Sequence, residues 1–201
     1  HNVDLNIDTI PYLHRQNDEE YNAKLDKAFE LLTRGDTAGV FQVESDGMKN
    51  TLRQMKPHHF RNIVAAISLY RPGPIQFIDT YIKRMHKQEP IEYRHPKMQE
   101  ILEETYGIMV YQEQIMQVAN KLFGYTKGEA DIIRKDVAKK TGKLESHKAK
   151  FLEMGPRHDI NVETSEKIWG DIEAFASYGF NKCLAGDTLI YNADTNDLQK
   201  I

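Results

Sequence analysis

The residue types best suited to chemistry in this 201-residue chain are basic, and they gather at two places. The first is Arg71 in the turn "YRPGP", where two prolines and a glycine fix the backbone at the end of an expected helix. A guanidinium held there is preorganised for a forked contact with a phosphate or a carboxylate. The alternative interpretation is a helix stop that carries a surface arginine.

The second basic group is the run "RKDVAKKTGK" at residues 134–143. The spacing of Arg134, Lys135 and Lys139 lets a helix present them over a limited arc, and Lys140 extends that surface. Such a surface can follow a phosphate backbone or hold a triphosphate, whereas the alternative is a solvated helix face. The "TGK" in this run is not a phosphate-binding loop, because the required upstream glycine and the following Ser or Thr are missing.

A third candidate is the polar stretch "YGIMVYQEQIM" at residues 106–116. Here Tyr111, Gln112 and Gln114 follow a run that looks buried, where an unpaired polar group is costly. The two glutamines and Glu113 between them therefore form either an internal hydrogen-bonding network or a substrate contact. Tyrosines in this region can stack on bases, although aromatic residues at helical spacing are more often core residues.

The composition narrows the class of protein. Apolar residues make up 40% and charged residues 28%, as in soluble globular proteins, and a net charge of -3 means that any basic surface is local. The single cysteine excludes a disulfide framework and suits a reducing cytosol, so a cytoplasmic location is expected. No apolar run is long enough to span a membrane. The eight histidines form no metal-binding motif, so no metal site is expected within the chain.

The hydrophobic pattern predicts a mainly α fold with a few short strands. Residues 38–45 alternate like a strand, and residues 108–124 begin as a strand and continue as a helix. Asp18 and Gly35 are the expected caps of the first helix, and Asn161 or Thr164 is the expected cap of the last. The helices are expected at residues 18–35, 45–57, 60–70, 74–87, 95–107, 126–155 and 161–182. Because each apolar stripe is modest, the helices must pack on each other.

Five segments of the chain occur in a characteristic order and spacing. They are "TRGDTAGVFQVESDGMK", "IVAAISLYRPGP", "YGIMVYQEQIMQVA", "GYTKGEADIIRK" and "FASYGFNK". This series resembles the alpha subunit of bacterial DNA polymerase III, a replicative C-family polymerase, over about residues 4 to 182. The resemblance implies that residues 1–182 are the helical fingers region, which closes on the incoming dNTP and the primer–template.

The resemblance also implies roles for individual residues. The basic groups near the triphosphate and the DNA would be Arg71, Arg134, Lys135, Lys139, Lys140 and Lys182, and the supporting residues would be Tyr111, Gln112 and Gln114. The family usually continues the basic pair as "AMGKK", whereas this chain has Asp136 and Ala138 in that stretch.

In the family the catalytic Mg²⁺ ions are held by palm carboxylates upstream of this region. The resemblance therefore implies no metal within the fragment and no polymerase activity from these residues alone. The implied partners of the parent protein are primer–template DNA, dNTP, the sliding clamp and the exonuclease subunit. A different class of protein remains as an alternative: a non-catalytic helical nucleic-acid-binding module with an ordinary C-terminal cysteine.

The chain changes character at Cys183, its only cysteine. Where the family continues with Ser-His, this chain reads "CLAGDTLIYNADTNDLQKI", which resembles the N-terminal block of an intein over residues 183–201. The resemblance implies that the Cys183 thiol attacks the Lys182 carbonyl to form a thioester, with a short β-type segment following it. The expected partner is the rest of the intein, contiguous or on a separate chain, with a downstream polymerase segment. The alternative is a buried structural cysteine.

Overall fold

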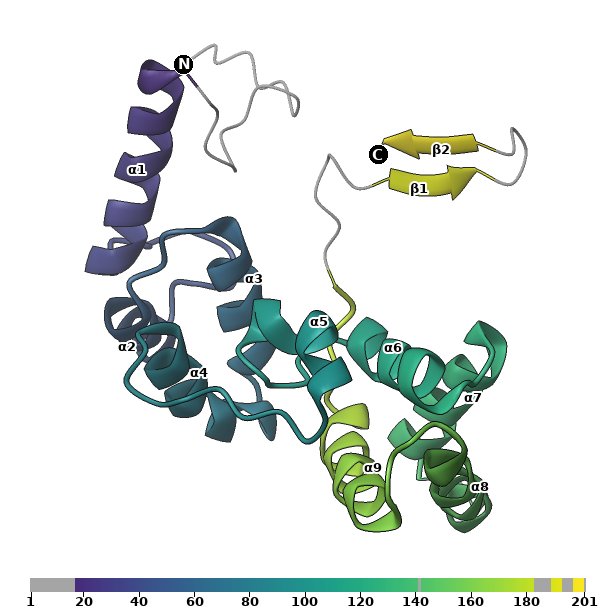
Figure 1. The fold of residues 1–201 in the computed structure, drawn as a ribbon. Helices are drawn as coiled ribbons and strands as arrows, with labels where there is room; N and C mark the ends of the chain where they lie inside the picture. Colours follow the sequence, from purple (N-terminus) through teal and green to yellow (C-terminus); the bar gives the residue numbers. More distant parts are fainter. Residues whose placement is uncertain (1–16, 141, 183–188, 193–196, 201) are drawn as a thin grey trace.

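The computed structural model describes residues 17–140, 142–182, 189–192 and 197–200, and it is mainly helical, as predicted (Figure 1). The α-helices are α1 Glu19–Arg34, α2 Asp46–Met55, α3 Phe60–Leu69, α4 Ile78–Met85, α5 Gln99–Leu102, α6 Gln112–Phe123, α7 Lys127–Ala138, α8 Leu144–Arg157 and α9 Val162–Ala176. Three short 3₁₀ helices lie between them: η2 Pro74–Phe77, η3 Pro96–Met98 and η4 Glu103–Thr105.

The expected caps of the first and last long helices are confirmed. The Asp18 carboxylate accepts a hydrogen bond from the Tyr21 N–H at 3.1 Å, and Gly35 ends α1 with a left-handed φ of 74°. For α9, Asn161 is the cap, because its side-chain oxygen accepts the Thr164 N–H at 2.8 Å.

The strand expected at residues 38–45 is wrong, because these residues form hydrogen-bonded turns between α1 and α2. Gly39 and Gln42 have φ values of 75° and 64°, which an extended strand does not tolerate. Of the alternating apolar residues only Val43 is buried, where its carbonyl accepts the Thr37 hydroxyl at 2.5 Å. The alternation was typical of a strand, but no neighbouring strand is present among the described residues to pair with it.

The single long helix expected at residues 126–155 is also wrong. The chain forms α7, which ends at Ala138, has turns at residues 139–140 and 142–143, and forms α8 from Leu144. Lys140 has a φ of 49°, and a hydrogen bond of 2.8 Å between Asp136 Oδ2 and His147 Nε2 joins the two helices. The turn lets α8 pack on α9 and on α6, and Lys139 and Lys140 therefore lie at the end of a helix and not in its middle.

Strands play almost no part in the described helical region. Between residues 17 and 182 the structure has one isolated parallel bridge, which pairs Tyr111 with Phe180, in place of the strand expected before α6. Beyond it, β1 Leu189–Asn192 pairs antiparallel with β2 Asp197–Lys200, with Leu189 opposite Lys200. The β1 strand lies within the segment for which the sequence predicted a strand.

A continuous hydrophobic core joins the helices from Val43 to Ala176. In the half formed by α6 to α9, the fully buried Phe151 ring stacks on Phe123 with a centroid distance of 3.7 Å and lies 5.2 Å from Trp169. These aromatic contacts hold α8 against both α6 and α9. No helix in the described ranges is long and apolar enough to cross a lipid bilayer.

Replacing Phe151 with alanine should destabilise the fold by about 3–5 kcal/mol, because it empties a site that is closed on several sides by aromatic rings. Urea unfolding followed by circular dichroism measures this change. The control is Val162→Ala, since Val162 is 49% exposed and its truncation should cost far less. Equal effects of the two substitutions would contradict this account of the core.

Candidate functional site

The turn that follows α3 holds Arg71 as the sequence predicted. Gly73 adopts a φ of 99°, and Pro74 begins η2 directly after it. The Arg71 Nε donates to the Ser68 carbonyl at 2.9 Å, and Nη2 donates to the Tyr178 carbonyl at 2.7 Å. Partial burial lowers the pKa of the guanidinium, which still carries its charge at neutral pH. Arg71 is therefore fixed in place, and its Nη1 donates to no residue in the described part of the chain.

Arg71 contacts the segment of residues 178–182, which is called here the C-terminal strip. It lies along the residues that begin α6: the Phe180 N–H donates to the Val110 carbonyl at 3.1 Å, and the Gln112 N–H donates to the Phe180 carbonyl at 3.0 Å. The Gln112 side chain adds a bond of 3.0 Å from Nε2 to the Gly179 carbonyl. The strip is thus bonded to the polar stretch at residues 106–116, although the two segments are about 70 residues apart in the sequence.

Arg134 on α7 is connected to the C-terminal strip through Gln112. Its Nη1 donates to Gln112 Oε1 at 2.9 Å, while Nε and Nη2 donate to Asp131 Oδ1 at 3.1 and 2.6 Å. Asp131 also pairs with Lys135 at 2.5 Å, and these two cations lower the pKa of its carboxyl, with Lys135 as the larger cause. A single carboxylate therefore holds both basic residues of the "RK" pair.

Lys182 is the last residue of the strip, and both its backbone and its side chain contact a carboxylate. Its backbone N–H donates to Glu113 Oε2 at 3.0 Å, and its ammonium lies 2.8 Å from both oxygens of Glu104. The ammonium is also 5.7 Å from the centre of the Tyr111 ring, which is itself 3% exposed. Lys182 is thus exposed but anchored, and Tyr111 supports it from within the core.

Gln114 lies in the interior behind the strip. Its Oε1 accepts the N–H groups of Val110 and Tyr111 at 2.9 and 3.0 Å, and its Nε2 donates to Ile101 and Thr105. Since the side chain is 2% exposed and makes four hydrogen bonds, the geometry favours the internal network over a direct substrate contact.

Five of the predicted site residues therefore come together: Arg71, Tyr111, Gln112, Arg134 and Lys182. Lys139 and Lys140 are exposed at the end of α7 and have no ion pair within the described residues. Cys183 lies outside the described residues. Sequence reasoning missed the acidic partners Asp131 and Glu104, whereas Glu113 belongs to the polar stretch for which it predicted either a hydrogen-bonding network or a substrate contact. The spacing of Asp131, three and four residues before Arg134 and Lys135, was a usable signal for the first of them.

The start of α7 has its own electrostatic anchor. Glu129 accepts hydrogen bonds from the N–H and hydroxyl of Thr126 at 2.9 and 2.8 Å, and Lys150 on α8 lies 2.9 Å from its other oxygen. These contacts, led by the Thr126 N–H, lower the pKa of Glu129 to about 2. The capping box and the ion pair together fix the helix that carries Arg134.

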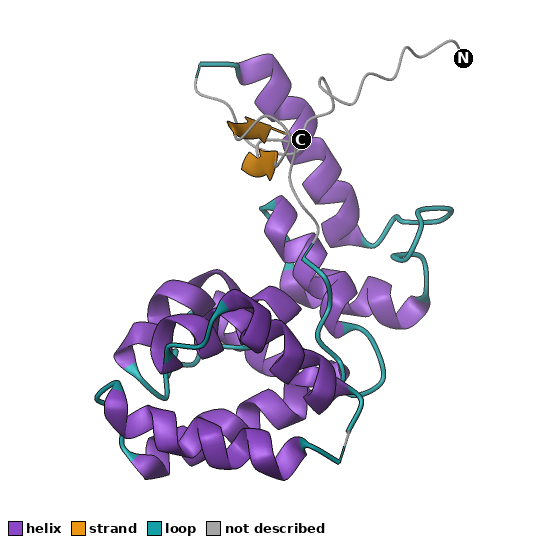
Figure 2. Cartoon of the chain, turned by 90° about the vertical axis from the view of Figure 1, so that its right-hand side faces the viewer, coloured by secondary structure: helices purple, strands orange, loops and turns teal. Residues whose placement is uncertain are grey.

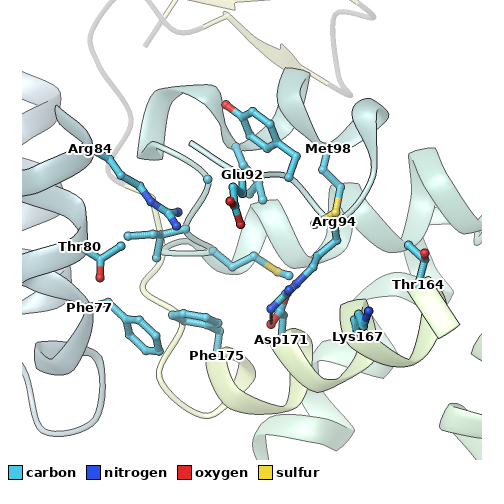
Figure 3. A pocket seen from close by; sticks show the side chains of 15 residues that line it. Phe77, Thr80, Arg84, Glu92, Arg94, Met98, Thr164, Lys167, Asp171 and Phe175 are labelled. Carbon is cyan, nitrogen blue, oxygen red and sulfur yellow. Dashed lines mark hydrogen bonds and ion pairs between the residues drawn. The ribbon is translucent and has the colours of Figure 1, made fainter. Parts of the chain in front are cut away.

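A separate cleft of about 440 Å³ opens between α4, residues 92–109 and α9 (Figure 3). The Phe77 and Phe175 rings pack on one another in its wall, with their centroids 4.4 Å apart. At its rim an ion pair of 3.1 Å links Arg94 to Asp171 on α9. None of the predicted site residues lines this cleft. The described residues also contain no group of three or more His, Cys, Asp or Glu that could hold a metal ion.

The sequence of this chain matches a family of known proteins. The family model for the finger domain of the bacterial DNA polymerase III alpha subunit matches residues 6–158. The DNA polymerase III subunit alpha of Aquifex aeolicus strain VF5 is 45% identical over 185 residues, which are 90% of this chain and 15% of that protein. That of Staphylococcus aureus strain Mu50 is 42% identical over 184 residues, 91% of this chain and 16% of that protein.

The chain therefore belongs to the finger-domain family of the bacterial DNA polymerase III alpha subunit. It spans less than one fifth of the length of these relatives.

The Glu129 carboxyl should titrate near pH 2 in the folded chain, well below the ordinary value of about 4.3 for a glutamate. Because its pKa is lowered on folding, its contribution to stability is complete above the unfolded pKa and is lost as the pH falls from about 4.3 toward 2. Carboxyl ¹³C NMR of the folded chain measures the midpoint directly. Lys150→Met should raise this midpoint, and a midpoint near 4 in the unsubstituted chain would contradict the anchor.

Proposed function

We propose that this chain is the fingers part of a replicative DNA polymerase and that it helps to bind the incoming dNTP and the primer–template. The observation that carries the proposal is the meeting of Arg71 and Arg134 at the C-terminal strip. Two guanidinium groups from distant parts of the chain are held on one framework. The family to which the chain belongs supplies the polymerase context.

The positive charges of Arg71 and Arg134 are suited to phosphoryl transfer. This reaction depends on positioning and on stabilising negative charge more than on covalent help from the protein. Arg71 keeps its Nη1 available for a phosphate oxygen, and Gln112 and Asp131 orient the Arg134 guanidinium. The exposed Lys139 and Lys140 are suited to the phosphate backbone of DNA.

Other parts of the parent protein would supply what this chain lacks. Palm carboxylates outside this chain would hold the Mg²⁺ ions, and the ions would neutralise the negative charge that develops during the reaction. Residues 1–182 would form the fingers unit. The sliding clamp and the exonuclease subunit would be partners of the parent polymerase. Within this chain, the described residues would bind and orient the substrates.

Arg71→Gln in the complete polymerase should lower kcat/KM for dNTP roughly tenfold to hundredfold, because a charge-assisted hydrogen bond contributes about 1.5–3 kcal/mol. Arg71→Lys should fall in between, since it keeps the charge but loses the fork. Steady-state primer extension measures both variants, and fluorescence anisotropy measures the affinity for primer–template.

The matched control for this experiment is Arg94→Gln, which removes an arginine from the separate cleft and should leave dNTP use unchanged. Primer–template affinity should change little in the Arg71 variants. An equal loss of DNA affinity and of dNTP incorporation would contradict the dNTP role and favour the non-catalytic nucleic-acid-binding module.

We further propose that Cys183 begins an intein at residues 183–201, on the strength of the sequence resemblance. Lys182, whose carbonyl would be attacked, is an exposed residue of the described chain. In the first step the Cys183 sulfur would bond to the Lys182 carbonyl carbon, the bond to the Cys183 nitrogen would break, and the thiol proton would pass to that nitrogen.

Cys183→Ala should abolish thiol-dependent cleavage after Lys182 in a precursor that carries the complete splicing domain, because alanine has no nucleophile. Mass spectrometry after treatment with dithiothreitol detects the released thioester fragment. The unsubstituted precursor should release a product that ends at Lys182. If it releases none, Cys183 is an ordinary residue and the proposed intein is wrong.

A further inference from the structure

Tyr178 is an exposed aromatic residue beside the Arg71 guanidinium. It is 45% exposed, whereas Tyr111, a stacking candidate from the sequence, is 3% exposed. The Tyr178 carbonyl accepts a hydrogen bond from Arg71 Nη2 at 2.7 Å. Tyr178 belongs to the C-terminal strip, which follows α9 as a loop (Figure 2). An accessible ring therefore lies on the residue that contacts the arginine proposed to bind the triphosphate.

The Tyr178 ring packs against Gly73, in the turn that also carries Arg71. A Cβ atom added at Gly73 would lie 2.6–2.8 Å from three atoms of the ring, so a larger residue there would displace it. Gly73 also has a φ of 99°, which other residues rarely adopt. The ring is therefore fixed by the same turn that fixes Arg71, and a fixed ring loses little conformational entropy when a ligand covers it.

The second aromatic ring of the strip has a different role. Phe180 is partly buried against the hydrophobic core, and its ring centre lies 4.9 Å from Arg71 Cζ. Phe180 thus supports the guanidinium from within the protein. Tyr178 is more exposed, and its hydroxyl makes no hydrogen bond with the described residues. Neither the core nor a hydrogen bond of the described chain accounts for this second ring.

A nucleoside triphosphate has the two kinds of surface that this arrangement fits. Its phosphates are suited to Arg71 Nη1, which donates to no residue in the described part of the chain. Its base has a flat face that can stack on an aromatic ring. Stacking does not depend on the identity of the base, because every base has such a face. A polymerase that must accept all four dNTPs can therefore use the same ring for each of them.

We propose that Tyr178 is the surface on which the base of the incoming dNTP stacks while Arg71 binds the triphosphate. This inference rests on the proposed function, because it takes the triphosphate to lie at Arg71. The contact is made by the Tyr178 ring and not by its hydroxyl. Gly73 and the strip hold the ring in position, so the base and the phosphates of one dNTP are bound by adjacent groups.

The test compares Tyr178→Ala with Tyr178→Phe in the complete polymerase. Single-turnover primer extension gives the apparent Kd for each of the four dNTPs. Inhibition by inorganic tripolyphosphate, which has phosphates but no base, measures the phosphate site separately. We expect Tyr178→Ala to raise the Kd of every dNTP about fivefold to hundredfold and to leave inhibition by tripolyphosphate unchanged. Tyr178→Phe should restore dNTP binding, because it keeps the ring.

Three results for Tyr178→Ala would overturn the proposal. An unchanged Kd for dNTP would mean that the base lies elsewhere. An equal loss of dNTP and tripolyphosphate binding would mean that Tyr178 only supports Arg71 through its carbonyl. A loss of primer–template affinity in fluorescence anisotropy, with dNTP binding intact, would mean that the ring contacts DNA.

Arg71→Gln in the same assays separates this inference from the proposed function. The proposed function predicts weaker binding of both dNTP and tripolyphosphate in this variant. If Arg71→Gln weakens both and Tyr178→Ala weakens neither, the stacking fails alone. If Arg71→Gln changes neither and Tyr178→Ala still raises the Kd of every dNTP, the role of Arg71 fails and the stacking surface stands.

Discussion

The docking of residues 178–182 on the start of α6 is the interaction on which the rest of the site depends. Backbone hydrogen bonds of 3.0–3.1 Å between Phe180 and the residues Val110 and Gln112 fix the strip. The Gln112 amide then connects the Gly179 carbonyl with Arg134, and the Tyr178 carbonyl receives Arg71. Without the strip, the two guanidinium groups would have no common support.

The acidic residues decide how each basic residue is presented. Asp131 holds Arg134 and Lys135, and Glu104 holds Lys182, so these cations are oriented by a protein carboxylate. Such partly exposed pairs contribute little to stability, and their effect is chiefly on geometry. Lys139 and Lys140 have no such partner in the described residues and present a solvated charge. The surface thus combines positioned groups with freely hydrated ones.

Local patterns in the sequence were enough for much of the helical architecture. The Asp18 and Gly35 caps could be predicted because capping depends on residues within one turn. The strand at residues 38–45 could not be excluded in the same way, since alternation does not reveal whether a partner strand exists. The break after α7 depended on the packing of Phe151 against Phe123 and Trp169, a long-range contact that periodicity does not report.

In the candidate site, too, local features could be predicted from the sequence and long-range contacts could not. Arg71 could be identified from its rigid turn, but its contact with the Tyr178 carbonyl spans 107 residues and has no local signal. Gln114 could be recognised as a polar residue in a buried setting, whereas only the structure shows that four protein groups satisfy it.

The most direct test of the central claim is a structure of the complete polymerase with primer–template and an incoming dNTP. The account predicts that Arg71 Nη1 lies within hydrogen-bonding distance of a triphosphate oxygen, with Arg134 beside it and the strip still on α6. A triphosphate bound elsewhere, with Arg71 and Arg134 contacting only protein groups, would contradict it.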